Sequence, residues 1–174
     1  MRATLFGLTM AASWFLAGTT YGQDTLVVVY GVLKDFTTKD TLRDLSVEAT
    51  DQKWGRRVGA RMTQEGQYVL DMVDEAVWLI EYAAPGYVPK RILVDLRGPT
   101  AEEWIGGFGM NVDMLMLREL PGLDYSVLQE PMGVCRYDSA SDIFVWDSVS
   151  VARMRDRVEP LHEAYYKRLA ATAR

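Results

Sequence analysis

The sequence predicts a mostly β protein, an antiparallel β-sandwich or small barrel, that ends in an amphipathic α-helix. Three observations support this fold class. Apolar residues alternate with a period of two from Leu26 to about Leu117, which is the period of a β-strand. Polar, glycine-containing turns separate these runs. From Val151 to Leu169 the apolar residues instead follow the three-to-four spacing of a helix.

The first 22 residues have the layout of a cleaved secretory signal peptide. Arg2 supplies a positive charge, an apolar run extends from Leu5 to Leu16, and small residues precede Gln23. The apolar run is short for a membrane span; a buried N-terminal helix and an uncleaved anchor are the alternatives. We therefore expect an exported protein of the periplasm or cell surface, with no transmembrane segment after cleavage.

Seven or so short strands are expected downstream of the signal peptide. The first, Leu26–Leu33, is apolar on both faces, which indicates a central strand or one covered on both sides. The others each present one apolar face, formed in turn by Leu45, Val47 and Ala49, by Tyr68, Leu70 and Met72, by Trp78, Ile80 and Tyr82, by Ile92, Val94 and Leu96, and by Val112, Met114 and Met116. No helix-period segment interrupts them, which argues against a parallel α/β sheet.

Two interruptions of this rhythm could carry function. Ala84–Gly86 breaks the chain between two apolar runs, either as a turn or as a binding site. The glycine-rich loop 97–109 carries Trp104, Ile105 and Phe108, which either tuck under the loop or face a partner.

The C-terminal segment predicts a helix that docks on the rest of the protein. Its apolar stripe consists of Val151, Met154, Val158, Leu161, Tyr165 and Leu169. Asp147 or Ser148 can cap its start. Pro160 lies inside the stripe, and since a proline in a helix interior costs about 3 kcal/mol, we expect a kink or a break near Glu159. A free coiled coil is the alternative.

Three motifs together resemble the carboxypeptidase regulatory-like domain, also called transthyretin-like. They are "VYGVLKDFTTKDTLRDLSVEA", "TQEGQYVLDM" and "EYAAPGYVPKRILVDL". The resemblance implies a seven-stranded Greek-key β-sandwich over residues 23–120, with residues 121–174 outside it as a connector and helix. It also implies an accessory module without an active site, found on secreted peptidases, outer-membrane transporters and other envelope proteins. In that family Gly86 would form a structural corner and Tyr87 would pack over the end of the core.

The charge is distributed unevenly. The chain carries a formal net charge of -5; without the signal peptide this becomes -6, split into +3 for residues 151–174 and -9 for residues 23–150. An acidic body argues against nucleic-acid binding. A basic tail suggests docking on its own domain or on an acidic partner.

Few residues suggest catalysis or a cofactor, and we expect neither. Cys135 is the single cysteine, so no internal disulfide can form and a buried hydrophobic role is favoured. His162 is the single histidine, too few for a zinc site, with no nucleophile to place beside it. Asp138 and Asp142 share a turn that could bind calcium, but a plain surface turn is favoured.

The expected function is therefore a non-enzymatic interaction or assembly module of the bacterial cell envelope, with a protein partner. The predicted contact surface consists of Trp104, Ile105 and Phe108 together with the basic helix residues Arg153, Arg157, Lys167 and Arg168. The alternative is a carbohydrate-binding module that stacks sugars on Trp54 or Trp104, since Trp78 belongs to an inward strand face.

Overall fold

A computed structural model describes residues 27–73, 75–105 and 107–172. The predicted signal peptide lies outside these residues. The described chain forms β1 (Val27–Gly31), β2 (Leu33–Asp35), β3 (Ser46–Asp51), β4 (Arg57–Gly59), β5 (Arg61–Met62), β6 (Tyr68–Met72), β7 (Val77–Ala83), β8 (Lys90–Asp95), β9 (Phe108–Asn111), β10 (Met114–Met116), the 3-10 helix η1 (Ser126–Gln129), β11 (Pro131–Asp138), β12 (Ile143–Trp146) and α1 (Ser148–Thr172).

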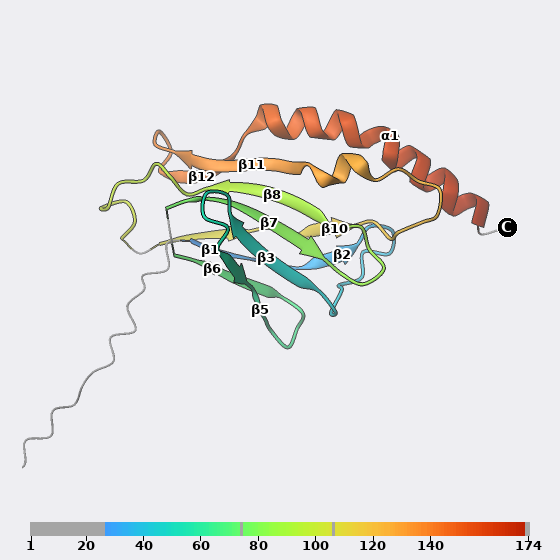
Figure 1. Cartoon of the computed structure of the whole chain (residues 1–174), viewed down its shortest axis with the longest axis horizontal. Coiled ribbons are helices and arrows are strands. Elements are labelled where there is room, and N and C mark those ends of the chain that lie inside the picture. The colour runs from blue at the N-terminus through green and yellow to red at the C-terminus, as the bar shows by residue number, and fades with distance from the viewer. Residues whose placement is uncertain (1–26, 74, 106, 173–174) are drawn as a thin grey trace, which may run out of the picture.

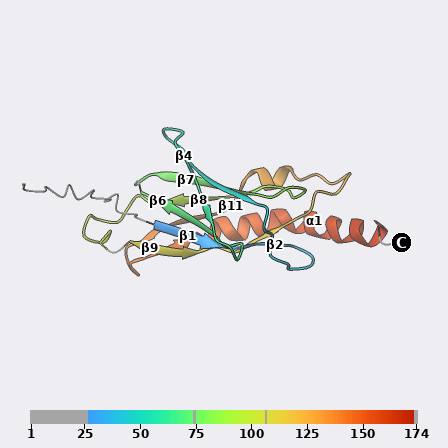
Figure 2. The same ribbon diagram turned by 90° about the horizontal axis from the view of Figure 1, so that it is seen from below.

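The strands form two facing layers with one long helix beside them (Figures 1 and 2). One layer is a six-stranded sheet in the order β12-β11-β8-β7-β3-β4. The other contains the four-stranded sheet β5-β6-β1-β9 and the pair β10-β2, which continues it. The fold is thus a mostly β sandwich with a C-terminal helix, as the sequence predicts.

The two-residue alternation correctly identified the inward faces of the strands. Along β6, β7 and β8 every second side chain is buried, and these side chains meet those of the opposite layer in one apolar core. Trp78 is fully buried in this core. In β1 Val27, Val29 and Gly31 are buried, while Val28 and Tyr30 are half-buried, so this central strand is covered completely on one face.

The strand count and pairing differ from the prediction of seven antiparallel strands. Twelve strands form among the described residues, and three pairs are parallel: β1 with β9, β2 with β10 and β8 with β11. Parallel neighbours cannot be joined by a tight turn, and here the partners lie far apart in the sequence, because the chain passes from β8 to β9 in the other layer and returns to the larger sheet at β11. The hairpin β11–β12, from the region expected to be a connector, extends the larger sheet.

The C-terminal helix packs on the body of the same chain, as predicted. Met154, Val158, Leu161 and Tyr165 are buried against Phe36, Leu117 and Leu128. The Asp147 carboxylate accepts the Ser150 N–H at 2.9 Å and caps the first turn. No helix among the described residues is long and apolar enough to cross a membrane.

The predicted break near Glu159 is wrong, because α1 continues through Pro160 (Figure 1). Pro160 lies on the exposed side of the helix, where water can satisfy the carbonyl that loses its helical donor. Burial of Leu161 and Tyr165 on the other side offsets the cost of the proline.

The segment Ala84–Gly86 is a structural corner between β7 and β8. Gly86 has a φ of +77°, which favours glycine, and the Tyr87 N–H donates to the Ala84 carbonyl at 3.1 Å. The Tyr87 ring packs against the end of the core, and its hydroxyl donates to Asp35 at 2.9 Å. The geometry is that of a turn, as the sequence motif implied.

Gly31, the last residue of β1, lies against the backbone of Val112, just after β9. A Cβ atom there would lie 2.3 Å from the Val112 carbonyl oxygen, and that oxygen already accepts the Tyr68 hydroxyl at 2.7 Å. We therefore expect Gly31→Ala to lower the free energy of unfolding by about 1–3 kcal/mol. Urea denaturation would measure this, with Gly59→Ala as control, since its Cβ would meet no atom within 4 Å. Equal stability of the two variants would contradict the close approach.

Candidate functional site

The loop that was expected to offer apolar contacts is mostly part of the core. Trp104 is 8% exposed, and its ring lies 5.4 Å from that of Phe108 and 6.1 Å from that of Phe144 on β12. Phe108 is half-buried in the same cluster. Ile105, at 83% exposure, is the one residue of the predicted three that faces solvent fully.

The basic residues of α1 are only partly available. Arg157 pairs with Glu130 through Nη2 and Oε1 at 2.7 Å. Arg153, Lys167 and Arg168 are exposed and form no ion pair within the described part of the chain. Figure 1 shows the loop before β9 at one end of the molecule and the C-terminal end of α1, which carries Lys167 and Arg168, at the other, so these two cations do not form one continuous surface with the loop.

Trp54 lies on the hairpin loop between β3 and β4, which Asp51 holds in place. The buried Asp51 carboxylate accepts the N–H groups of Lys53 and Trp54 at 2.8 and 3.3 Å, and Arg56 Nη2 at 3.0 Å. The hydrogen bond from Lys53 is the main reason that the pKa of Asp51 lies below its ordinary value. Gly55, with a φ of +69°, completes the turn. A single carboxylate thus fixes the backbone from which the Trp54 side chain projects.

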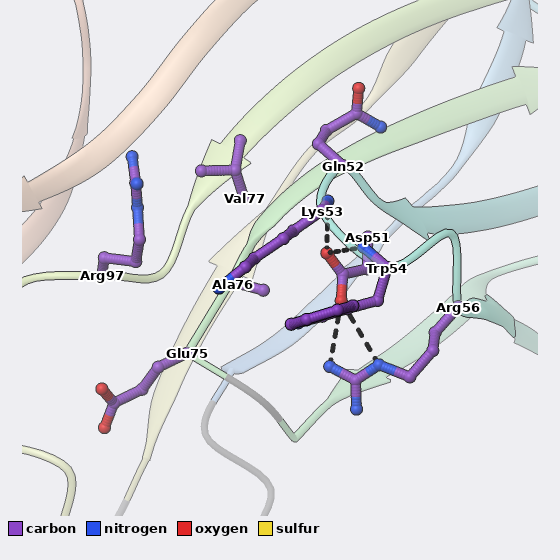
Figure 3. Close-up of a pocket in the computed structure, with 9 residues that line it drawn as sticks. All are labelled: Asp51, Gln52, Lys53, Trp54, Arg56, Glu75, Ala76, Val77 and Arg97. Carbon is purple, nitrogen blue, oxygen red and sulfur yellow. Dashed lines mark hydrogen bonds and ion pairs between the residues drawn. The ribbon is translucent and has the colours of Figure 1, made fainter.

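A cavity of about 560 Å³ lies beside this loop (Figure 3). We call it the Trp54 pocket. Its lining residues come from the β3–β4 loop, the start of β7 and the end of β8: Asp51, Gln52, Lys53, Trp54, Arg56, Glu75, Ala76, Val77 and Arg97. Its volume lies within the range of pockets that bind small ligands.

The pocket combines an exposed aromatic ring with several hydrogen-bonding groups. Trp54 is 69% exposed, and the Lys53 ammonium lies 4.7 Å from its ring centroid. Such a cation–π contact at an exposed site is worth only about 0.5–1 kcal/mol, so a ligand can displace it. Arg97 donates Nε and Nη2 to Asp95 at 2.8 and 2.7 Å.

The sequence identified Trp54 but missed the rest of the pocket. A local signal was present, because an Asp side chain often accepts a hydrogen bond from the backbone two residues on and glycine supplies a positive φ in turns, and Asp51 and Gly55 flank Trp54 in this way. Glu75 and Arg97 carried no such signal. They reach the pocket only because β7 pairs with β3 and β8 pairs with β7 in the sheet.

The remaining candidates form no visible reactive centre. Cys135 is buried, and burial raises its pKa to about 11, which suits the hydrophobic role predicted for it. The His162 ring stacks on Phe36 at 4.7 Å, and burial, together with Lys90 and Lys39, lowers its pKa.

The turn that was considered for calcium is satisfied internally. Asp138 accepts the Ser141 hydroxyl and Asp142 accepts the Tyr137 hydroxyl, both at 2.6 Å. Over the described residues, no group of three or more His, Cys, Asp or Glu side chains could hold a metal ion.

No protein-family model matches the chain, and the search of curated proteins gave no match. Three solved structures illustrate the structural matches. Catechol 1,2-dioxygenase from Acinetobacter sp. ADP1 is 14% identical over 65% of this chain and 59% of its own, with a TM-score of 0.41. The pilus 2b backbone protein of group B streptococcus is 10% identical over 52% of this chain and 40% of its own, with a TM-score of 0.37.

The third is a candidate carbohydrate-binding protein from Bacteroides uniformis, 11% identical over 53% of this chain and 42% of its own, with a TM-score of 0.36. In all three cases the match spans less than two thirds of the other protein. These similarities concern part of a β fold and indicate no activity for this chain.

Proposed function

We propose that this protein is an exported, non-enzymatic binding module of the bacterial cell envelope that recognises a carbohydrate at the Trp54 pocket. The observation that carries the proposal is the exposed Trp54 indole on a rigid turn beside the cavity of about 560 Å³. Membership of the carboxypeptidase regulatory-like family, which the three sequence motifs suggest, is part of the same proposal.

The chemistry of the pocket suits a sugar. A pyranose ring has an apolar face of C–H groups that packs on an indole, and hydroxyls around its rim that need donors and acceptors. Gln52 and Glu75 offer oxygen acceptors, and Arg97 offers an N–H donor. Positive and negative charges cancel in the Asp51–Arg56 ion pair, which lines the pocket, and in the Asp95–Arg97 pair at its side. Lys53 and Glu75 add one charge of each sign. A neutral saccharide therefore fits better than a strongly charged ligand.

The protein-binding hypothesis is weaker for a physical reason. It depended on the aromatic side chains of the loop before β9, and Trp104 is buried beneath that loop. Two co-planar exposed indoles would have strengthened the carbohydrate hypothesis further, and Trp104 cannot supply the second one. The exposed cations Arg153, Lys167 and Arg168 remain available to an acidic protein partner.

Titration calorimetry of the exported protein against a panel of neutral envelope and plant glycans would test the proposal. We expect saturable binding by at least one glycan, and a loss of about 30-fold in affinity on Trp54→Ala, the scale of a tryptophan hot spot of about 2 kcal/mol. Trp54→Phe should retain part of the affinity. Tyr166→Ala removes another exposed aromatic ring, on α1, and should leave glycan affinity unchanged.

Two outcomes would overturn the proposal. One is a panel in which no glycan binds, which would return an acidic protein partner to first place. The other is glycan binding that Trp54→Ala leaves unchanged, because the pocket would then not be the site.

A further inference from the structure

The helix α1 meets the rest of the protein in an apolar cluster of its own. The buried residues of this cluster are Phe36, Leu117, Leu128, Met154, Val158, Leu161 and Tyr165. None of them belongs to the core between the two β layers. Separate cooperative units of a protein can open with different free energies. Opening of α1 would therefore expose this second cluster and leave the core of the sandwich in place.

His162 lies on α1 at the border of this cluster, in a contact that suits only its neutral form. Its ring stacks on Phe36, with the ring centroids 4.7 Å apart and the planes at 27°. Its Nε2 atom is buried and has no hydrogen-bond partner among the described residues. A protonated imidazole donates from both ring nitrogens, and a buried donor without an acceptor is unfavourable. The docked helix thus offers no acceptor for the proton that His162 gains in acid.

Two lysines of the body lie near this histidine. The Lys39 ammonium lies 4.8 Å from the centroid of the Phe36 ring. Lys90 on β8 is 4% exposed, and its ammonium donates to the Leu115 carbonyl at 2.6 Å. Burial lowers the pKa of Lys90 only to about 8, so Lys90 still carries its charge in mildly acidic solution. Within the described parts of the chain neither lysine forms an ion pair.

The acidic residues around the histidine do not compensate these two charges. Asp35 is already held by an ion pair and three further hydrogen bonds. On α1 itself Glu159 lines the same cavity as the histidine, but so does the cation Arg155. Asp40 and Glu163 are exposed to water, which screens their charges. The surroundings of the histidine therefore carry an excess of positive charge.

We propose that His162 makes the docking of α1 sensitive to mild acid, because its protonated ring adds a third positive charge beside Lys39 and Lys90. Burial, followed by Lys90 and Lys39, holds the pKa of His162 below its ordinary value of about 6.5 while the helix is docked. When α1 opens, the pKa returns toward that value, so the open state binds more protons as the pH falls. The docking free energy is therefore complete above about pH 6.5 and declines as the pH falls through and below this value. The inference is independent of the Trp54 pocket, which α1 does not line.

NMR titration of the imidazole tests the first step directly. His162 is the only histidine of the chain, so the protein without a histidine tag gives a single imidazole Cε1–H signal. We expect the midpoint of its titration to lie below pH 6.5, because the docked helix disfavours the protonated ring. A midpoint at or above pH 6.5 would overturn the proposal, since docking would then favour the charged form.

Hydrogen exchange of the whole protein at pH 7.5 and pH 5.5, corrected for the intrinsic exchange rate, tests the second step. Peptides from α1 should lose protection in acid by several-fold, with a limit of about tenfold for one proton over the pH unit below 6.5. Peptides from β6 and β7, which belong to the other cluster, should keep their protection.

Two variants identify the group responsible. His162→Phe keeps an aromatic ring on Phe36 but cannot titrate, so it should remove the acid effect. Tyr166→Phe is the matched control, because it changes a second ring near Phe36, 5.6 Å away, and keeps the histidine; it should behave as wild type. The inference is wrong if α1 loses no protection in acid, or if wild type and His162→Phe lose it equally, since another group would then be responsible.

Discussion

Asp35→Ala is expected to lower the free energy of unfolding by about 3–4 kcal/mol, although the residue touches no candidate site. The Asp35 carboxylate is buried and accepts hydrogen bonds from the N–H groups of Thr37 and Thr38 at 2.7 and 2.9 Å, from the Tyr87 hydroxyl at 2.9 Å and from Arg118 Nε at 2.7 Å. It therefore joins the turn after β2, the corner before β8 and the strand end after β10. Removing it leaves several donors without an acceptor, at a cost of about 1–3 kcal/mol for each one that water cannot reach.

The same residue predicts a pH dependence. Burial raises the pKa of Asp35, but the hydrogen bonds, led by that from Arg118, outweigh burial and hold the pKa well below its ordinary value. Between the folded and unfolded pKa values the unfolded state binds more protons, so the free energy of unfolding rises with pH there. The contribution of Asp35 should be complete above the unfolded value of about 4 and should decline as the pH falls through and below it.

Urea denaturation at pH 7 and pH 3 would measure both effects. The stability difference between wild type and Asp35→Asn should be largest at pH 7 and smaller at pH 3, because only the wild type loses a charged acceptor on acidification. Asp40→Ala, an exposed acid in the same turn, is the control and should cost less than about 0.5 kcal/mol. A constant difference between wild type and Asp35→Asn at the two pH values would contradict the assignment.

Tyr165→Ala is expected to cost about 3–5 kcal/mol, the scale of removing a buried aromatic side chain. Tyr165 is fully buried at the centre of the contact between α1 and the β layers. Its ring meets Phe36 edge-on at 5.9 Å, and its hydroxyl accepts the Arg118 N–H at 3.2 Å. The variant therefore removes both packing and the partner of a backbone donor.

Thermal or urea unfolding would test whether the helix docks on its own chain in solution. Tyr165→Phe should cost only about 1 kcal/mol, since it loses the hydrogen bond but keeps the ring. Lys167→Ala, exposed on the same helix, should change the stability by less than about 0.5 kcal/mol. If Tyr165→Ala were as stable as Lys167→Ala, α1 would not contribute to the folded monomer.

The prediction of elements succeeded where a local period was visible. The alternation in β6, β7 and β8 correctly predicted which face of each strand is buried, and the apolar stripe from Met154 to Tyr165 correctly predicted the buried face of α1. It failed for the hairpin β11–β12. In β11 only Gly133 and Cys135 are buried, and "IFVW" in β12 has no alternation, so neither strand shows a half-buried pattern.

The candidate sites were less predictable than the strands. Trp54 and Trp104 both lie in loops close to glycine and were equal candidates for exposure. They differ because Phe144, from a strand some 40 residues further along the chain, covers Trp104, whereas nothing comparable covers Trp54. A local pattern contains no information about which distant segment will cover a loop.

The sequence by itself therefore determined the β class, the inward face of most strands and the docking stripe of the helix, because these follow from side-chain spacing along a few neighbouring residues. Only the tertiary structure decided the parallel pairings, the six-stranded sheet with its bare edge at β12, and the gathering of Asp51, Glu75 and Arg97 around Trp54. The physical reason is that burial and pocket formation depend on which distant segments pack together, and the free energy of that packing belongs to the whole chain.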